Sequence, residues 1–125
     1  MVEKKKKILF IEDEATLQKA IGTFLEAEGY EIISVLDGEA GIARANKDMP
    51  DLILLDLILP KKDGFEVLAE LKTNEATKKI PVIVLTNLEG IGYVDRAIEL
   101  GATTYLVKAN YTLEEVIQKV KEALA

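Results

Sequence analysis

Five short apolar runs recur along the chain, and a stretch with helical periodicity separates each run from the next. The runs are rich in Ile, Val and Leu, which is typical of strands buried on both faces of a sheet. They cover residues 8–11, 31–35, 52–55, 81–85 and 104–107. Because strands and helices alternate, the sequence predicts a parallel sheet covered by helices on both faces.

The stretch after the first run predicts a helix with one buried face. Apolar residues with the i, i+3, i+4 spacing of such a face are Leu17, Ala20, Ile21, Phe24 and Leu25. Gly29 stands where a residue in the left-handed conformation would end the helix. We therefore expect a helix that packs these apolar side chains on the sheet and ends just before Gly29.

Further helices are expected over residues 38–47, 64–72 and 94–100, and from Thr112 to near the end of the chain. Asp37 can cap the first of these, and Gly101 ends the shorter third one. Thr112 and Glu115 have the spacing of a capping box. The buried face of the last helix is expected to comprise Leu113, Val116, Ile117, Val120 and Leu124. The predicted architecture is one α/β domain over residues 1–125, with a doubly wound, five-stranded parallel sheet and five helices.

The composition excludes several kinds of chemistry. The chain has no cysteine and no histidine, which rules out disulfides, thiolate zinc sites, His-dependent catalytic triads and a phosphohistidine carrier. The net charge of −6 argues against direct binding to nucleic acid. No apolar stretch reaches the ~18–20 residues needed to span a membrane, and the lysines at 4–7 are expected to form a solvated start to the first strand. We therefore expect a cytoplasmic protein.

Polar side chains follow four of the predicted strands: Glu12 and Asp13 the first, Asp56 the third, Thr86 the fourth and Lys108 the fifth. Ligands of such sheets bind beyond the carboxyl ends of the strands. Each residue alone has an ordinary explanation, such as helix capping for the first two acids, a strand-end hydroxyl or a solvated lysine. The third acid, however, interrupts the apolar run LILLDLIL, where an unpaired carboxylate is rare. The shared edge therefore predicts one functional site.

These residue types suit phosphoryl transfer. Three carboxylates close together raise one another's pKa unless a counter-ion is present. Mg²⁺ prefers oxygen ligands and keeps several waters, so carboxylates without His or Cys suit it. A lysine ammonium and a threonine hydroxyl can contact phosphate oxygens. Together these groups would position and neutralise a phosphoryl group, with the central carboxylate, Asp56, as the nucleophile.

The segments ILFIEDE, LILLDLILPKKDGFEVL, PVIVLTN and GATTYLVK, in this order, resemble the receiver domains of two-component response regulators. The resemblance extends over essentially the whole chain. It implies a flavodoxin-like fold with strand order 2-1-3-4-5. It also implies that a sensor histidine kinase or a histidine phosphotransfer protein donates a phosphoryl group to Asp56, which changes the face that binds an output protein.

The same resemblance implies a metal site and identifies the side chains beside the acceptor, whose apolar character leads us to expect slow self-dephosphorylation. Glu12 and Asp13 match the acidic pair that holds Mg²⁺ together with Asp56. The main-chain carbonyl of Ile58 would be a further ligand. In receivers, the side chains two positions past the acceptor and two past the switch threonine flank the approach of the hydrolytic water. These side chains are Ile58 and Leu88 here, and both are apolar.

Three more residues match the parts of a receiver that respond to the phosphoryl group. Thr86 matches the switch hydroxyl, Lys108 the phosphate-binding lysine, and Tyr105 the aromatic residue that turns inward on activation. Two neighbours depart from the family pattern. Ala109 follows the lysine where the family usually has proline, so the aim of the lysine depends on whether this bond is cis. Asn87 stands where the family prefers a small residue, and would narrow access to the site.

Three other functions compete with this one. An aspartyl phosphatase needs a second acid two residues after its nucleophile, where Ile58 stands. A dinucleotide-binding loop is disfavoured because Gly90 and Gly92 follow a predicted strand but Asp95 takes the place of the third glycine. The alternative that stays open is an interaction module with the same fold that is not phosphorylated.

Overall fold

The computed structural model describes residues 4–125, in which five parallel strands form one sheet. The strands are β1 (Lys7–Ile11), β2 (Glu31–Val35), β3 (Leu52–Leu55), β4 (Val82–Thr86) and β5 (Thr104–Val107). Their order in the sheet is β2-β1-β3-β4-β5, and every neighbouring pair is parallel. The predicted fold class and strand order are confirmed. The fourth strand begins and ends one residue later than expected, and its last residue is Thr86.

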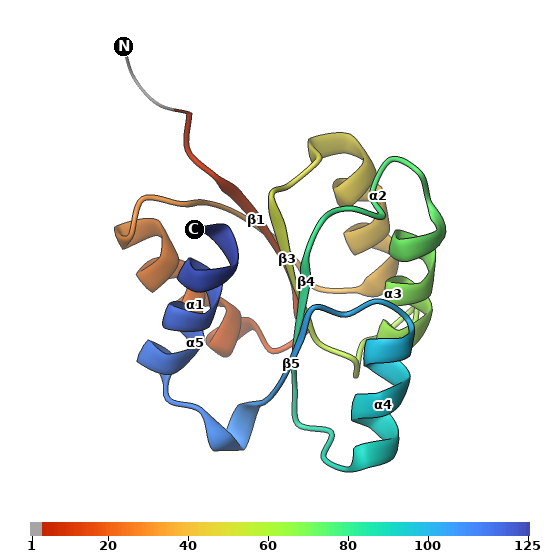
Figure 1. Cartoon of the computed structure of the whole chain (residues 1–125). Coiled ribbons are helices and arrows are strands. Elements are labelled where there is room, and N and C mark those ends of the chain that lie inside the picture. Colours follow the sequence, from red (N-terminus) through yellow and green to blue (C-terminus); the bar gives the residue numbers. More distant parts are fainter. Residues whose placement is uncertain (1–3) are drawn as a thin grey trace.

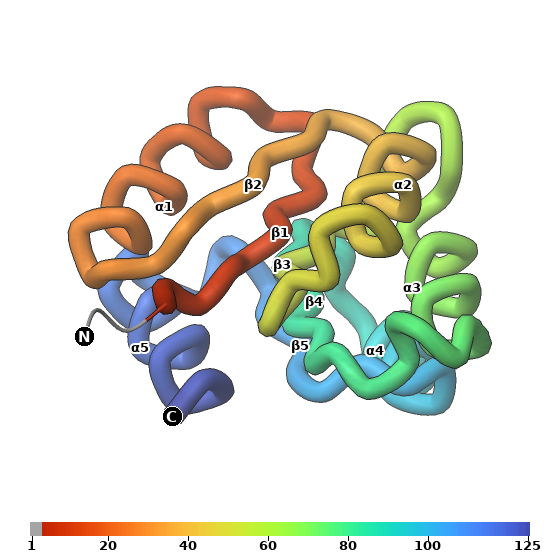
Figure 2. Tube along the Cα trace, turned by 90° about the horizontal axis from the view of Figure 1, so that it is seen from above, coloured from red at the N-terminus to blue at the C-terminus, as the bar shows by residue number. Residues whose placement is uncertain are grey.

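Helices cover both faces of the sheet, as Figure 1 shows. The helices α1 (Ala15–Ala27) and α5 (Leu113–Leu124) lie on one face, and α2 (Gly38–Asp48), α3 (Gly64–Thr73) and α4 (Ile91–Glu99) lie on the other. The view in Figure 2 shows α1 beside the edge strand β2. A short 3₁₀ helix, Lys108–Asn110, follows β5. Within residues 4–125, no helix has the length and apolar character that crossing a bilayer requires.

The core has two layers because side chains alternate between the faces of each strand. In β1, Ile8 and Phe10 pack in the cluster with α1 and α5, whereas Leu9 and Ile11 pack in the cluster with α2, α3 and α4. All four side chains are fully buried. Burial of each such side chain contributes about 1.5–3 kcal/mol. The central strands are therefore held from both sides, and their carboxyl ends have fixed positions.

The helix ends follow the signals in the sequence. The Asp37 side chain accepts a hydrogen bond from Ala40 N at 2.8 Å. Thr112 and Glu115 form the expected capping box, with hydrogen bonds of 2.9 and 3.2 Å. Gly29 has a φ of 96°, as expected for the left-handed residue after α1. On α5 the buried side chains are Val116, Ile117 and Val120, while Leu113 and Leu124 are half-buried.

The buried face of α1 differs from the predicted one. Ala20 and Phe24 were expected in the core, but both are exposed, and the Phe24 side chain is 47% accessible to solvent. Gln18 and Gly22 are buried instead, together with Ile21 and Leu25, which were expected in the core. The apolar spacing failed as a guide because a carboxamide can occupy a core position when its hydrogen bonds are satisfied.

Helix α4 begins at Ile91, three residues before the predicted start. Its first turn is formed by residues with few helix signals, but Tyr93 packs there against Phe65 of α3, with ring centroids 6.3 Å apart. The Arg96 guanidinium carbon lies 4.2 Å from the centre of the same Phe65 ring. These tertiary contacts stabilise the first turn, which local sequence patterns do not reveal.

The start of α3 depends on a close backbone approach that only glycine permits. Gly64 N donates to Leu57 O at 3.0 Å, and a Cβ atom at Gly64 would lie 2.3 Å from Leu57 Cα. We expect Gly64→Ala to lower the free energy of unfolding by about 1–3 kcal/mol or more, because the backbone must move to relieve this overlap. Urea unfolding followed by circular dichroism measures the change.

Gly92→Ala is the matched control, since a Cβ atom there meets nothing within 4 Å and Gly92 also lies in the first turn of a helix. It should leave stability unchanged or raise it by up to about 1 kcal/mol. Equal effects of the two alanines would contradict the close-approach explanation.

Candidate functional site

The structure brings the predicted site residues together at the carboxyl edge of the sheet. Glu12 and Asp13 directly follow β1, Asp56 follows β3, and Lys108 follows β5. Thr86 is the last residue of β4, which lies between β3 and β5 in the sheet. One carboxylate oxygen from each of the three acids lies within 4.8 Å of the others. Residues that are far apart in the sequence therefore form one acidic cluster.

Lys108 is the counter-ion of this cluster. Its Nζ lies 2.8 Å from Glu12 Oε1 and 3.1 Å from Asp56 Oδ2, with Glu14 Oε2 further away at 3.7 Å. No peptide bond between residues 4 and 125 is cis, so the lysine reaches the acids although the bond to Ala109 is trans. Burial disfavours the ammonium, but the contacts with Glu12 and Asp56 outweigh burial and raise the lysine pKa above its ordinary value.

Glu12 is the most deeply buried acid of the site. Its side chain is fully buried, and Oε2 accepts a hydrogen bond from Glu14 N at 3.1 Å. Oε1 receives only the ion-pair contact of Lys108 and no hydrogen bond with proper geometry from residues 4–125. Burial raises the pKa of Glu12 to about 7, and Lys108 opposes the rise. The native, metal-free protein therefore holds the Glu12 proton more tightly than the unfolded chain does. As the pH rises from 4.5 to about 7, the contribution of Glu12 to the free energy of unfolding declines.

The acceptor candidate Asp56 is held by both of its oxygens. Oδ1 accepts a hydrogen bond from Ile58 N at 3.2 Å, and Oδ2 accepts one from Lys108 Nζ. Asp56 is 4% exposed, whereas Asp13 beside it is open to solvent. Three carboxylates face one ammonium, and a buried oxygen of Glu12 lacks a hydrogen bond. This donor set, all oxygen and with an excess of negative charge, fits a hard divalent cation such as Mg²⁺.

The loop after β4 connects the site to Tyr105. Thr86 is fully buried, and its Oγ1 accepts a long hydrogen bond of 3.4 Å from Leu88 N. The Tyr105 hydroxyl donates to Leu88 O at 2.8 Å. Burial raises the pKa of Tyr105, and the charge of Asp56 adds to the rise, so this hydroxyl remains a donor at neutral pH. The two candidate switch residues therefore both bond to the main chain of Leu88, Thr86 at its N–H and Tyr105 at its carbonyl.

The two side chains that the family resemblance places beside the acceptor are apolar. Ile58 is 51% exposed, and Leu88 is half-buried against the core. Asn87 lies between Thr86 and Leu88 and is exposed. Neither apolar side chain can hydrogen-bond a water molecule.

Two residues near the site were missed in the sequence. Glu14 contributes its main-chain N–H to Glu12 and a carboxylate 3.7 Å from Lys108, although a third acid in a row gives no distinct signal. Gln18 is buried and donates to two main-chain carbonyls. Its signal was present, because Gln18 lies three and seven residues before the buried Ile21 and Leu25 and so shares their helix face.

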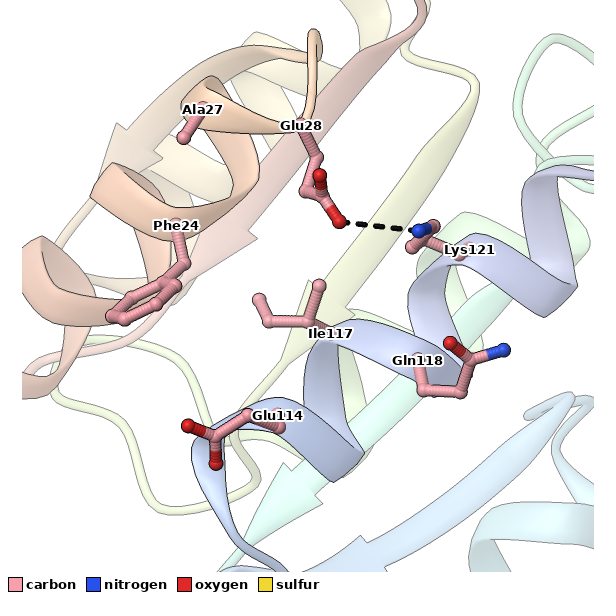
Figure 3. A pocket seen from close by; sticks show the side chains of 7 residues that line it. All are labelled: Phe24, Ala27, Glu28, Glu114, Ile117, Gln118 and Lys121. Atoms are coloured by element: carbon pink, nitrogen blue, oxygen red, sulfur yellow. Dashed lines mark hydrogen bonds and ion pairs between the residues drawn. The ribbon is translucent and has the colours of Figure 1, made fainter.

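A hollow between α1 and α5 is separate from this site. Phe24 and Ile117 line it, and Glu28 and Lys121 pair at 3.1 Å on its rim, as Figure 3 shows. None of the acids of the cluster lines it. Its ion pair is exposed to solvent, whereas Glu12 and Asp56 are buried, so we place the functional site at the carboxyl edge.

Comparison with known proteins gives a family. The family described as the response regulator receiver domain matches residues 8–121. CiaR, a transcriptional regulatory protein of Streptococcus pneumoniae, is 40% identical over 118 residues, which are 94% of this chain and 51% of CiaR. The chain spans about half the length, or less, of the curated relatives that it matches.

Solved structures of response regulators are similar to this chain in fold and in sequence. The Mn²⁺-bound form of the response regulator Rcp1 has a TM-score of 0.81 and 37% identity, covering 94% of this chain and 92% of Rcp1. The phosphorylated cyanobacterial phytochrome response regulator RcpA has a TM-score of 0.81 and 34% identity, covering 95% of this chain and 91% of RcpA. With the family match and the acidic cluster, these likenesses lead to one conclusion. The chain belongs to the response regulator receiver domain family.

Proposed function

We propose that this protein is a phosphorylation-dependent signalling switch of the cytoplasm and that Asp56 is its phosphoacceptor. The observation that carries the proposal is the placement of a buried Asp56 carboxylate beside the Lys108 ammonium and two further acids. The donor is a phosphohistidine of a sensor histidine kinase or a histidine phosphotransfer protein. This chain has no histidine and so cannot supply the phosphohistidine itself.

In the proposed transfer, one Asp56 oxygen attacks the phosphorus of the donor. A P–O bond to the aspartate forms while the P–N bond to the donor imidazole breaks, and the imidazole leaves with the electron pair of that bond. Lys108, already 3.1 Å from Asp56 Oδ2, would contact a phosphoryl oxygen and balance its charge. The chain thus assists its own phosphorylation without acting on an external substrate.

The residues that would hold Mg²⁺ are Glu12, Asp13 and Asp56, with the main-chain carbonyl of Ile58 as a further ligand. When bound, Mg²⁺ neutralises negative charge on the carboxylates and the phosphoryl oxygens. The buried Glu12 oxygen that lacks a hydrogen bond supports this assignment. The metal-bound and phosphorylated states named for the relatives Rcp1 and RcpA also support it.

The proposed output is a population shift around α4. Thr86 would move toward the phosphoryl group and take Leu88 with it, because Leu88 N is bonded to its hydroxyl. The Tyr105 hydroxyl would then lose its acceptor at Leu88 O and be free to turn inward. A phosphoryl group that contacts only one of the two arrangements favours that arrangement. The output protein that reads the new face is a further partner of the switch.

The phosphoacceptor is tested with Mg²⁺ and a small phosphodonor such as acetyl phosphate. We expect one phosphoryl group per chain by intact-protein mass spectrometry, and its loss in Asp56→Asn, because the amide is not a nucleophile of the required kind. Asp63→Asn is the control, since Asp63 lies outside the acidic cluster and caps α3. Undiminished labelling of Asp56→Asn would remove this residue from the proposal, and no labelling of the wild type would favour the unphosphorylated interaction module.

The affinity for Mg²⁺ should depend on pH through Glu12. A metal ligand must lose its proton, and burial raises the pKa of Glu12 to about 7. We expect the apparent affinity to weaken by up to about tenfold for each pH unit below that value and to level off above it. Calorimetric titration at several pH values measures the profile. Glu12→Gln should bind more weakly and with a flatter profile, and an unchanged slope in this variant would assign the proton to another group.

The lifetime of the phosphorylated state should be long because apolar side chains flank the acceptor. Ile58 and Leu88 cannot orient a water molecule for attack, and much of the advantage of proximity is lost without that orientation. We expect the phosphorylated wild type to decay at least several-fold more slowly than the double variant Ile58→Asn with Leu88→Glu. The measurement is first-order decay after removal of the donor at matched Mg²⁺ concentration.

A double variant that changes the shape of both side chains but keeps them apolar provides the control for this comparison. Ile58→Val with Leu88→Ile keeps both flanks apolar and should retain the slow decay. A wild type that decays as fast as the polar variant would refute the role of the apolar flanks and leave the acceptor assignment intact.

A further inference from the structure

Gln18 is a polar side chain on the buried face of α1. Its Nε2 donates hydrogen bonds to Phe10 O at 3.1 Å and to Val35 O at 2.8 Å, and the residue is 7% exposed. Phe10 lies near the carboxyl end of β1, and Val35 is the last residue of β2. Both hydrogens of the carboxamide nitrogen are therefore used. Gln18 ties α1 to two strands at the edge of the sheet that carries the acidic cluster.

One of these acceptors is shared with the site itself. Glu12 N donates to Val35 O at 3.1 Å, so this carbonyl receives both the main chain of Glu12 and the side chain of Gln18. The other acceptor, Phe10, precedes Glu12 by two residues. The Val35 carbonyl already accepts from the chain that follows β1, so the Gln18 amide adds a second hydrogen bond to it from α1.

We propose that Gln18 is a positioning residue for the magnesium site. This inference rests on the proposed function, because Mg²⁺ is the group that the positioned acids would bind. The Gln18 amide fixes the carboxyl ends of β1 and β2 relative to each other, and thereby the backbone from which Glu12 and Asp13 extend toward Asp56. Groups that orient metal ligands through hydrogen bonds change metal affinity although they do not contact the metal.

Packing alone does not explain a glutamine at this position. The neighbours of Gln18 on the same helix face are Ile21 and Leu25, and a leucine there would continue the apolar face. A buried carboxamide is costly unless its hydrogen bonds are made, and within residues 4–125 the Gln18 amide nitrogen makes them with the strand ends beside the acids. The effect of a glutamine instead of a leucine at position 18 is therefore expected at the carboxyl edge of the sheet.

The test compares Mg²⁺ binding by calorimetry in the wild type, Gln18→Leu and Ile21→Val, all measured well below the temperature of unfolding. Ile21 is fully buried in the same helix, so Ile21→Val loses packing but leaves the two carbonyls bonded. We expect Gln18→Leu to weaken binding by about tenfold or more. Ile21→Val should lower Tm with an unchanged Kd. In the absence of metal, the Glu12 amide should exchange its hydrogen faster in Gln18→Leu only.

The possible results separate this inference from the proposed function. Wild-type affinity in Gln18→Leu overturns the positioning role and leaves the magnesium site standing, and so does unchanged exchange at the Glu12 amide. A wild type that binds no Mg²⁺ overturns the site and this inference with it. Gln18→Asn replaces Gln18→Leu if the latter does not fold, because its amide is one methylene shorter and cannot reach both carbonyls. The same loss of affinity is expected for it.

Discussion

The Lys108 ammonium is the charge on which the carboxyl edge of this protein depends. Glu12 and Asp56 are carboxylates buried side by side, and their mutual repulsion is strong where little water screens it. Lys108 contacts both, so Asp56 has a partner for its negative charge. It does not balance the whole cluster, because the cluster holds three carboxylates and Lys108 supplies one positive charge. The metal-free state is thus left with an excess of negative charge that a cation relieves.

Close backbone contacts fix the loops around this charge. Cβ atoms at Gly38 and Gly64 would lie 2.4 Å from Lys62 O and 2.3 Å from Leu57 Cα, so main chains touch where side chains usually intervene. Gly38 N also donates to Pro60 O at 3.4 Å. The segment that follows Asp56 therefore has close backbone contacts with the starts of both α2 and α3. A rigid loop lets the acceptor and its lysine keep their positions without reorganisation, which is the usual basis of electrostatic assistance in phosphoryl transfer.

Much of the fold and the choice of site could be predicted because the determining signals are local. Apolar runs define the strands, Asp37 and Thr112 cap helices as expected, and parallel topology brings the strand ends to one edge. The failures have a different physical origin. The face of α1 was misjudged because Gln18 is satisfied by carbonyls of other elements, and α4 starts early because its first turn packs on Phe65. The position of Gln18 on the helix face could be read from its spacing to Ile21 and Leu25, but its bonds to the two carbonyls and the contact of α4 with Phe65 leave no trace in local periodicity. The distances within the acidic cluster were likewise beyond the sequence, since strand ends alone specify an edge and not a separation.

Helix α4 is held by two connections that originate near the site. Phe65, directly after Gly64, stacks on Tyr93 in the first turn of α4. Tyr105 bonds to Leu88 O in the loop that leads into the same turn. In the proposed switch, movement of Thr86 displaces Leu88 and breaks the second connection, whereas the first is attached to the rigid start of α3. In the proposed switch, α4 would have discrete arrangements, and phosphorylation would act by changing their populations instead of bending α4 by degrees.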